Sequence, residues 1–119
     1  MKTEDFVSLE VAKLLKEKGY HESCNLYYYE EARIGDGELC VDWNNKFKFS
    51  FSCPTLYEAQ KWIRESKKLN IMVDFDESQL WGYSILKCYD EYSLIASDDL
   101  FNTYEEALDY GILEALKLI

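Results

Sequence analysis

The residues best suited to chemistry are two carboxylates that alternate along a predicted strand. Asp74 and Asp76 are separated by one residue, and a strand rises about 3.3 Å per residue, so both side chains are expected on one face about 7 Å apart. Such a pair could bind a divalent cation or serve a metal-dependent hydrolase. A solvated strand face explains the same carboxylates without any ligand, and we favour that interpretation.

A second candidate is the His21-x-x-Cys24 spacing, which is typical of metal ligands, with Cys40 and Cys53 available to complete a zinc set. Structural zinc sites favour two closely spaced ligand pairs, whereas this sequence has one. In a reducing compartment, cysteines are most simply interpreted as small buried hydrophobic residues. We therefore expect reduced cysteines, no metal and no other cofactor.

The motifs of nucleophilic catalysis and phosphate binding are missing. His21 is the single histidine, and no Gly-x-Ser-x-Gly turn is present. The segment Gly35-Asp36-Gly37 has neither the third glycine nor the Lys-Ser/Thr ending of phosphate-binding loops. The sequence therefore predicts a protein that is not an enzyme.

The charge is strongly negative and unevenly distributed. The net charge is −10, and residues 71–119 carry eleven acidic and two basic side chains, whereas residues 55–70 carry four basic and two acidic ones. Direct binding to a phosphate backbone requires the opposite balance, so nucleic acid is not an expected partner.

The length and composition predict a single domain over residues 1–119, because 48% of the residues are hydrophobic and a chain of this size can bury a core without staples. The longest uncharged stretches are nine residues, well below the roughly 20 apolar residues that a membrane span requires. The first residues turn acidic where a signal peptide would turn apolar. We expect a soluble protein of the cytoplasm.

Helical spacing of apolar residues predicts helices over residues 4–18, 56–68 and 104–118. Thr3 is expected to cap the first helix and Gly19 to end it. Thr55 and Thr103 each open a Thr-x-x-Glu-Ala motif, in which the threonine and the glutamate can form a capping box that contributes about 1 kcal/mol. Gly111, in the middle of the last helix, indicates a close approach to a sheet.

Alternating apolar residues predict strands over residues 26–31, 38–43, 46–53, 71–76, 81–89 and 92–97. Turns are expected at residues 34–37, 44–45 and 90–91. In the third strand, Phe47, Phe49 and Phe51 are expected to face the core, and Lys48, Ser50 and Ser52 to face solvent. The order is α-βββ-α-βββ-α, an α+β fold with a largely antiparallel sheet, helices on one side and an approximate internal repeat of residues 24–68 and 71–118.

Three helical blocks carry a resemblance: Glu-Val-Ala-Lys-Leu-Leu-Lys-Glu-Lys-Gly-Tyr, Cys-Pro-Thr-x-x-x-Ala-Gln-Lys-Trp-Ile-Arg-Glu and Tyr-Glu-Glu-Ala-Leu-x-x-Gly-x-x-Glu-Ala-Leu-Lys-Leu-Ile. They resemble a group of short uncharacterised proteins from gut bacteria and their phages or mobile elements. The resemblance implies a mobile-element setting and no particular activity, because the shared blocks are helices and not catalytic motifs.

The charge distribution and the aromatic residues together predict an accessory protein that binds another protein, with a basic partner as one expectation. Three consecutive tyrosines cannot share one face of a strand, so at least one should reach the opposite face, either for a protein contact or at a sheet edge or beneath a helix. The candidate interaction surface consists of Asp74, Asp76, Asp98, Asp99, Glu105, Asp109, Tyr28 and Trp62. In one alternative, the acidic half imitates DNA and inhibits a basic nucleic-acid-binding protein. Aromatic self-association as a homodimer and the carboxylate hydrolase are the others.

Overall fold

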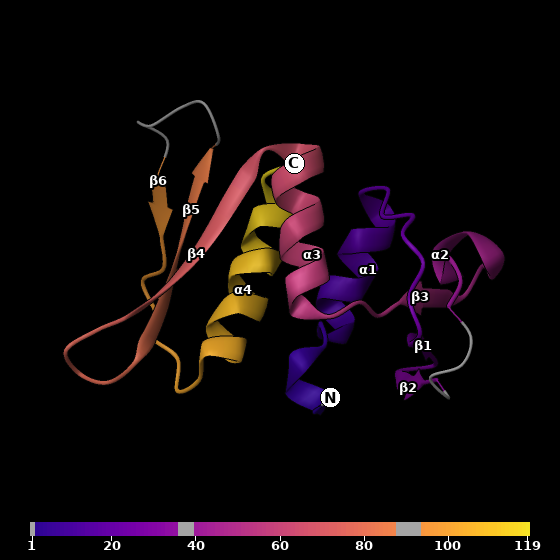
Figure 1. The fold of residues 1–119 in the computed structure, drawn as a ribbon, viewed down its shortest axis with the longest axis horizontal. Coiled ribbons are helices and arrows are strands. Elements are labelled where there is room, and N and C mark those ends of the chain that lie inside the picture. The colour runs from indigo at the N-terminus through magenta and orange to yellow at the C-terminus, as the bar shows by residue number, and fades with distance from the viewer. Residues whose placement is uncertain (1, 36–39, 88–93) are drawn as a thin grey trace.

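The computed structural model describes residues 2–35, 40–87 and 94–119. Helices α1 (Leu9–Glu17), α3 (Leu56–Trp62) and α4 (Tyr104–Lys117) lie in the middle of a molecule measuring 41 × 30 × 20 Å, and a small sheet lies at each end of its long axis (Figure 1). This arrangement confirms the α+β class. The strands form two separate sheets, where the sequence predicted one.

Both sheets are antiparallel and have three strands. The first has the order β2-β1-β3 and is built from β1 (Tyr27–Tyr29), β2 (Ala32–Ile34) and β3 (Ser50–Ser52). The second has the order β4-β5-β6 and is built from β4 (Leu69–Phe75), β5 (Trp81–Lys87) and β6 (Leu94–Ala96). The two halves of the predicted repeat, residues 24–68 and 71–118, therefore differ in sheet topology. The predicted turn at residues 90–91, residues 36–37 of another turn and the start of the predicted strand 38–43 lie outside the described residues.

The two threonine caps form where the sequence placed them. The Thr55 hydroxyl accepts a hydrogen bond from the Glu58 N–H at 3.1 Å, and the Glu58 carboxylate accepts one from the Thr55 N–H at 3.1 Å, which completes the capping box. The Thr103 hydroxyl accepts from the Glu106 N–H at 3.1 Å. Beyond Trp62, α3 continues as a π-helical turn, η2 (Ile63–Lys67).

The first helix begins later than predicted. Ser8 caps α1, and the predicted cap Thr3 belongs to a short 3-10 turn, η1 (Thr3–Asp5). Between them the chain is extended, because Phe6 forms a β-bridge with Thr55 and the Val7 N–H donates to the Pro54 carbonyl. The predicted end is confirmed, since Gly19 has a φ of 94° and the Tyr20 N–H donates back to the Leu15 carbonyl.

One hydrophobic core joins the central helices to both sheets. Helix α4 packs on β4 and β5, and α1 packs on α4 and β3. A Cβ atom at Gly111 would lie 2.9 Å from a methyl carbon of Ile71 and 3.1 Å from the ring of Tyr83, so the predicted close approach of this glycine to a sheet is confirmed. The fully buried large side chains include Leu15, Tyr20, Ile63, Ile71, Ile85, Ile112 and Leu116.

The segment before β3 departs most from prediction. In place of a strand end and a hairpin turn, residues 43–46 form a short helix, α2 (Trp43–Lys46). The Ser50 hydroxyl donates to the Trp43 carbonyl at 3.0 Å, and the Ser52 hydroxyl accepts from the Asn44 N–H at 3.1 Å. Both serines are therefore buried beneath α2, not exposed.

The three phenylalanines of this segment differ in burial. Phe51 lies on the opposite face of β3, is half-buried and packs against the core on the side of α1. Phe47 and Phe49 precede the strand and are exposed, Phe49 by 69%. The prediction that all three face the core is wrong for these two, because β3 begins only at Ser50 and the chain before it forms a turn outside the sheet.

The turn between β1 and β2 consists of two glutamates in the left-handed conformation, Glu30 (φ 49°) and Glu31 (φ 68°). Because Tyr29 pairs with Ala32, the turn has two residues, and this short hairpin geometry requires positive φ at both positions. A side chain with a Cβ atom pays roughly 1–2 kcal/mol for that conformation, and Asn-Gly suits it best.

We expect the double variant Glu30→Asn/Glu31→Gly to raise the free energy of unfolding by about 1–2 kcal/mol, because it relieves this strain. Urea denaturation of the variant and the wild type measures the difference. The Glu30→Gln/Glu31→Gln variant loses the same charges without the turn preference and should stay within about 0.5 kcal/mol of the wild type. An equal gain in both variants would mean that charge, not backbone conformation, is responsible.

Candidate protein-interaction surface

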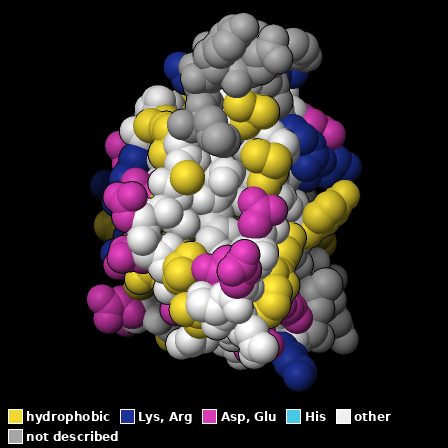
Figure 2. All heavy atoms as spheres, turned by 90° about the vertical axis from the view of Figure 1, so that its left-hand side faces the viewer, with side chains coloured by type: hydrophobic (Ala, Val, Ile, Leu, Met, Phe, Trp, Pro, Cys, Tyr) yellow, Lys and Arg dark blue, Asp and Glu magenta, His cyan; other side chains and the backbone are white. Residues whose placement is uncertain are grey.

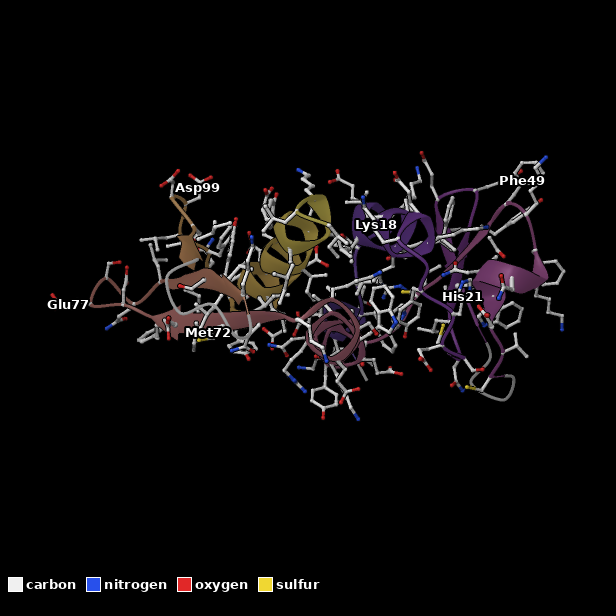
Figure 3. The ribbon with its side chains drawn as sticks, turned by 90° about the horizontal axis from the view of Figure 1, so that it is seen from above. Lys18, His21, Phe49, Met72, Glu77 and Asp99 are labelled. Carbon is white, nitrogen blue, oxygen red and sulfur yellow. The ribbon has the colours of Figure 1, made fainter. Side chains whose placement is uncertain are left out.

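The predicted acidic residues near the second sheet are exposed, and they do not form one row. Asp74 lies near the end of β4, and Asp98 and Asp99 follow β6. Figure 2 shows this end of the molecule, where the carboxylates stand in separate groups among uncharged atoms. Glu77 and Asp99 mark the same end in Figure 3.

Asp76 closes the turn between β4 and β5. Its Oδ1 atom accepts hydrogen bonds from the Ser78 hydroxyl at 2.6 Å, the Ser78 N–H at 2.9 Å and the Leu80 N–H at 3.1 Å. These bonds, led by that of the Ser78 hydroxyl, lower the pKa of Asp76. Among the described residues, no group of three or more His, Cys, Asp or Glu side chains could hold a metal ion. The Asp74–Asp76 pair therefore lacks a third protein ligand of these types within that part of the chain.

Asp109 connects two helices of the fold. Its Oδ1 atom accepts the N–H of Ser8 at 2.9 Å, which fastens α4 to the start of α1. Burial raises the pKa of Asp109, and the hydrogen bond to Ser8 opposes that shift. Glu105, one turn earlier, is half-buried. The predicted pair of surface carboxylates on this helix is therefore wrong at Asp109, whose carboxylate binds the chain's own backbone.

The two aromatic residues named as surface candidates differ in burial. Tyr28 is only 6% exposed: its hydroxyl donates to the Val7 carbonyl at 2.8 Å and accepts from Arg33 at 2.9 Å, so its selection as a contact residue is wrong. Trp62 is half-buried, meets the edge of Tyr20 at 5.2 Å between ring centroids and has the Lys67 ammonium over its ring.

The residues of the zinc alternative do not converge. The His21 ring is exposed and lies beside Asn45 and Asp42, at 3.0 and 3.7 Å. The Cys24 thiol is buried and donates to the Leu26 carbonyl at 3.1 Å. Burial raises the pKa values of Cys24 and Cys53 to about 11, so both thiols are protonated at neutral pH and are poor ligands and nucleophiles.

The most distinctive surface lies at the opposite end, on the first sheet. Its members are exposed or half-buried apolar side chains that surround one hollow of about 310 Å³, and we call them the aromatic surface: Tyr27, Tyr29, Ile34, Phe47 and Phe49. Phe49 marks this end in Figure 3, at the other extreme of the long axis from Glu77. The expectation that the three tyrosines do not share one face is confirmed, because Tyr28 is buried in the core whereas Tyr27 and Tyr29 line the hollow.

Polar contacts and ring stacking hold the aromatic surface in place. The Trp43 indole N–H donates to the Cys24 carbonyl at 2.6 Å, and its ring stacks on Tyr27 at 4.2 Å and on Phe47 at 5.9 Å. From α1, the Lys16 ammonium donates to the carbonyls of Phe47, Lys48 and Ser50 at 3.2, 2.9 and 2.8 Å. Burial lowers the pKa of Lys16. The aromatic side chains are therefore presented on a fixed backbone.

The charges beside the hollow are mainly positive. The Lys48 ammonium lies 5.4 Å from the ring centre of Phe49, and the Lys46 ammonium lies 5.8 Å from that of Phe47. The ion pairs found among the described residues are His21–Asp42 and Lys117–Glu114, so neither lysine has a carboxylate partner within that part of the chain. Glu30 and Glu31 line a neighbouring hollow together with Lys13.

The sequence matches no protein-family model, and neither the curated proteins nor the solved structures contain a significant match. Of the helices formed by the described residues, none has the length and apolar character needed to cross a membrane. The function is therefore inferred from the geometry of the surfaces.

We expect Lys16→Met to lower the free energy of unfolding by about 1–3 kcal/mol, because three backbone carbonyls lose a charged donor. Urea denaturation measures the loss. Lys13→Met is the matched control: Lys13 is exposed on the same helix, and its substitution should change stability by less than about 0.5 kcal/mol. Equal effects of the two substitutions would mean that the contacts of Lys16 with the carbonyls contribute nothing specific.

The raised pKa of Asp109 predicts a pH dependence of stability. The folded state retains the proton at pH values where the unfolded chain has lost it, so the favourable contribution of Asp109 is present below the unfolded pKa and is lost as the pH rises through the folded one. Asp109→Asn keeps a neutral acceptor for the Ser8 N–H. Its stability relative to the wild type should therefore increase from about pH 3 to pH 7.

Chemical denaturation of both proteins across this range measures the difference. Asp109→Ala, which removes the acceptor, should be less stable than Asp109→Asn at every pH by about 1–3 kcal/mol. A constant difference between the wild type and Asp109→Asn would contradict the assignment.

Proposed function

We propose that this protein is a small cytoplasmic accessory protein that binds another protein through its aromatic surface and has no catalytic activity of its own. The observation that carries the proposal is the gathering of Tyr29, Ile34, Phe47 and Phe49, each at least 40% exposed, around one hollow. Contiguous apolar side chains at a surface are typical of interaction sites, and aromatic residues are enriched there.

The size of the hollow supports a protein ligand. At about 310 Å³, it is at the lower limit of small-molecule pockets, which measure about 300–1,000 Å³, and it suits one or two inserted side chains. Among the described residues, Lys48 is the single charged residue of its lining, and Lys46 stands over the neighbouring ring of Phe47. The partner that fits is a protein segment with an exposed apolar side chain flanked by carboxylates.

The acidic alternatives receive less support. A DNA mimic needs rows of free carboxylates at its surface, and two of the candidates, Asp76 and Asp109, accept hydrogen bonds within the molecule. A carboxylate hydrolase would need more ligands than Asp74 and Asp76 supply among the described residues.

Selection from a random peptide library, followed by calorimetric titration of the retained peptides, tests the proposal. We expect peptides with an aromatic or aliphatic residue beside Asp or Glu, and an affinity at least about tenfold lower for Phe47→Ser/Phe49→Ser. Tyr57→Ser, which removes an aromatic ring that is 63% exposed on α3 and outside the aromatic surface, is the control and should bind like the wild type.

Both altered side chains of the double variant are exposed, so the variant should fold, and circular dichroism checks this. Failure to retain any peptide, or equal binding of the retained peptides by the double variant, would contradict the proposal. Peptides that depend on the two phenylalanines but contain no acidic residue would support the aromatic contact and contradict the role of the lysines.

A further inference from the structure

We propose that the chain carries a ligand for its own aromatic surface: the acidic turn at residues 74–77 of one copy binds the aromatic surface of a second copy, head to tail. This inference rests on the proposed function, because it uses the same surface and identifies its occupant. The turn reads Asp74-Phe75-Asp76-Glu77, an aromatic residue among three carboxylates.

Packing holds the aromatic ring of the turn, that of Phe75, in a fixed position. Phe75 is 54% exposed at the end of β4, and its ring rests on that of Trp81 at 4.7 Å between centroids. Trp81 in turn meets the edge of Tyr104 at 5.4 Å, so Phe75 stands on an aromatic base that is continuous with α4. The backbone beyond it is fixed by the three hydrogen bonds that the Asp76 carboxylate accepts. A preorganised ring loses little conformational entropy on binding.

The two surfaces are chemically complementary. The hollow offers aromatic walls to the Phe75 ring, and aromatic pairs gain from offset and edge-to-face contacts beyond the burial of area. The ammonium groups of Lys46 and Lys48 stand beside the hollow without carboxylate partners among the described residues. Asp74 and Glu77, both exposed, flank Phe75 along the sequence of the turn.

The positions of the two surfaces decide how such a contact would propagate. Phe49 and Glu77 lie at opposite extremes of the molecule (Figure 3), which measures 41 Å along its longest axis, so a turn cannot reach the aromatic surface of its own chain. A contact between two copies leaves one free aromatic surface and one free turn. Heterologous contacts of this kind extend into open chains or close into rings.

A symmetric dimer through two aromatic surfaces is the competing arrangement. It would place Lys46 and Lys48 of each copy near the same lysines of the other, and like charges disfavour such a contact. The head-to-tail contact pairs opposite charges instead. At physiological ionic strength the Debye length of about 8 Å screens the repulsion between two acidic molecules more than it screens groups in contact.

Complementary variants distinguish these arrangements in sedimentation velocity experiments over a concentration series. The wild type should form species larger than a dimer as its concentration rises. Phe49→Ser removes the aromatic surface and Phe75→Ser removes the turn ligand, and each variant alone should associate at least about tenfold more weakly. Their mixture should form a one-to-one dimer and nothing larger, because one intact surface and one intact turn remain. Tyr57→Ser should associate like the wild type.

A second pair of variants tests the charges without touching an aromatic ring. Glu77→Lys and Lys48→Glu should each weaken association, since each places like charges together. Mixing the two variants should restore association, because every contact between one variant and the other then pairs opposite charges. This rescue cannot arise from a loss of folding in either variant.

The outcomes separate this inference from the proposed function. A dimer that persists in Phe75→Ser, or a mixture of the two serine variants that stays monomeric, would overturn head-to-tail binding. A wild type that is monomeric at all concentrations while selected peptides still bind would also overturn it and leave the proposed function in place. A wild type that neither retains any peptide nor self-associates would contradict both the proposed function and this inference.

Discussion

The hydrogen bonds between the serines of β3 and helix α2 determine which residues of the first sheet meet solvent. Ser50 and Ser52 donate to or accept from the backbone of Trp43 and Asn44, and this fixes α2 over one face of the strand. The Asn44 side chain adds bonds to the Ser52 N–H and to the Tyr20 carbonyl, both buried. Buried polar groups that are fully paired define a single arrangement, because every alternative leaves one of them unsatisfied.

The exposure of Phe47 and Phe49 is a consequence of this arrangement. The chain reaches β3 through a turn outside the core, and Lys16 holds that turn by its carbonyls. The ammonium gains backbone carbonyls as acceptors, which compensates for its partial burial. Stability and presentation are thus linked here, because the contacts that complete the fold also place the aromatic rings at the surface.

Much of the helical framework could be predicted from sequence, because helix caps are local signals. Thr55 and Thr103 lie within four residues of the groups they bond, and Gly19 has the positive φ of a helix end. Strands β4 and β5 of the second sheet could be predicted equally well, because their residues alternate and a short connection joins them.

The first sheet could not be predicted in the same way. Alternation in residues 46–53 indicated buried phenylalanines, but the partners of Ser50 and Ser52 lie seven and eight residues away in a helix of four residues. The Glu30-Glu31 turn contains neither glycine nor asparagine, the residues from which such a turn is usually predicted. Likewise, no periodicity shows that Asp109 would bind a backbone N–H 101 positions earlier. The aromatic surface depends on these tertiary contacts. Sequence patterns alone therefore favoured the acidic residues near the other end of the molecule.

The bond between Asp109 and Ser8 also bears on how the chain acquires its structure. During synthesis α1 emerges early, yet its first turn is fastened by a residue 101 positions later, and its apolar face packs on α4. Contacts between distant segments form slowly, because a long loop must close before they contribute. The face of α1 that packs on α4 therefore remains uncovered until α4 is made, and in that interval the nascent chain is most exposed to aggregation and to chaperones.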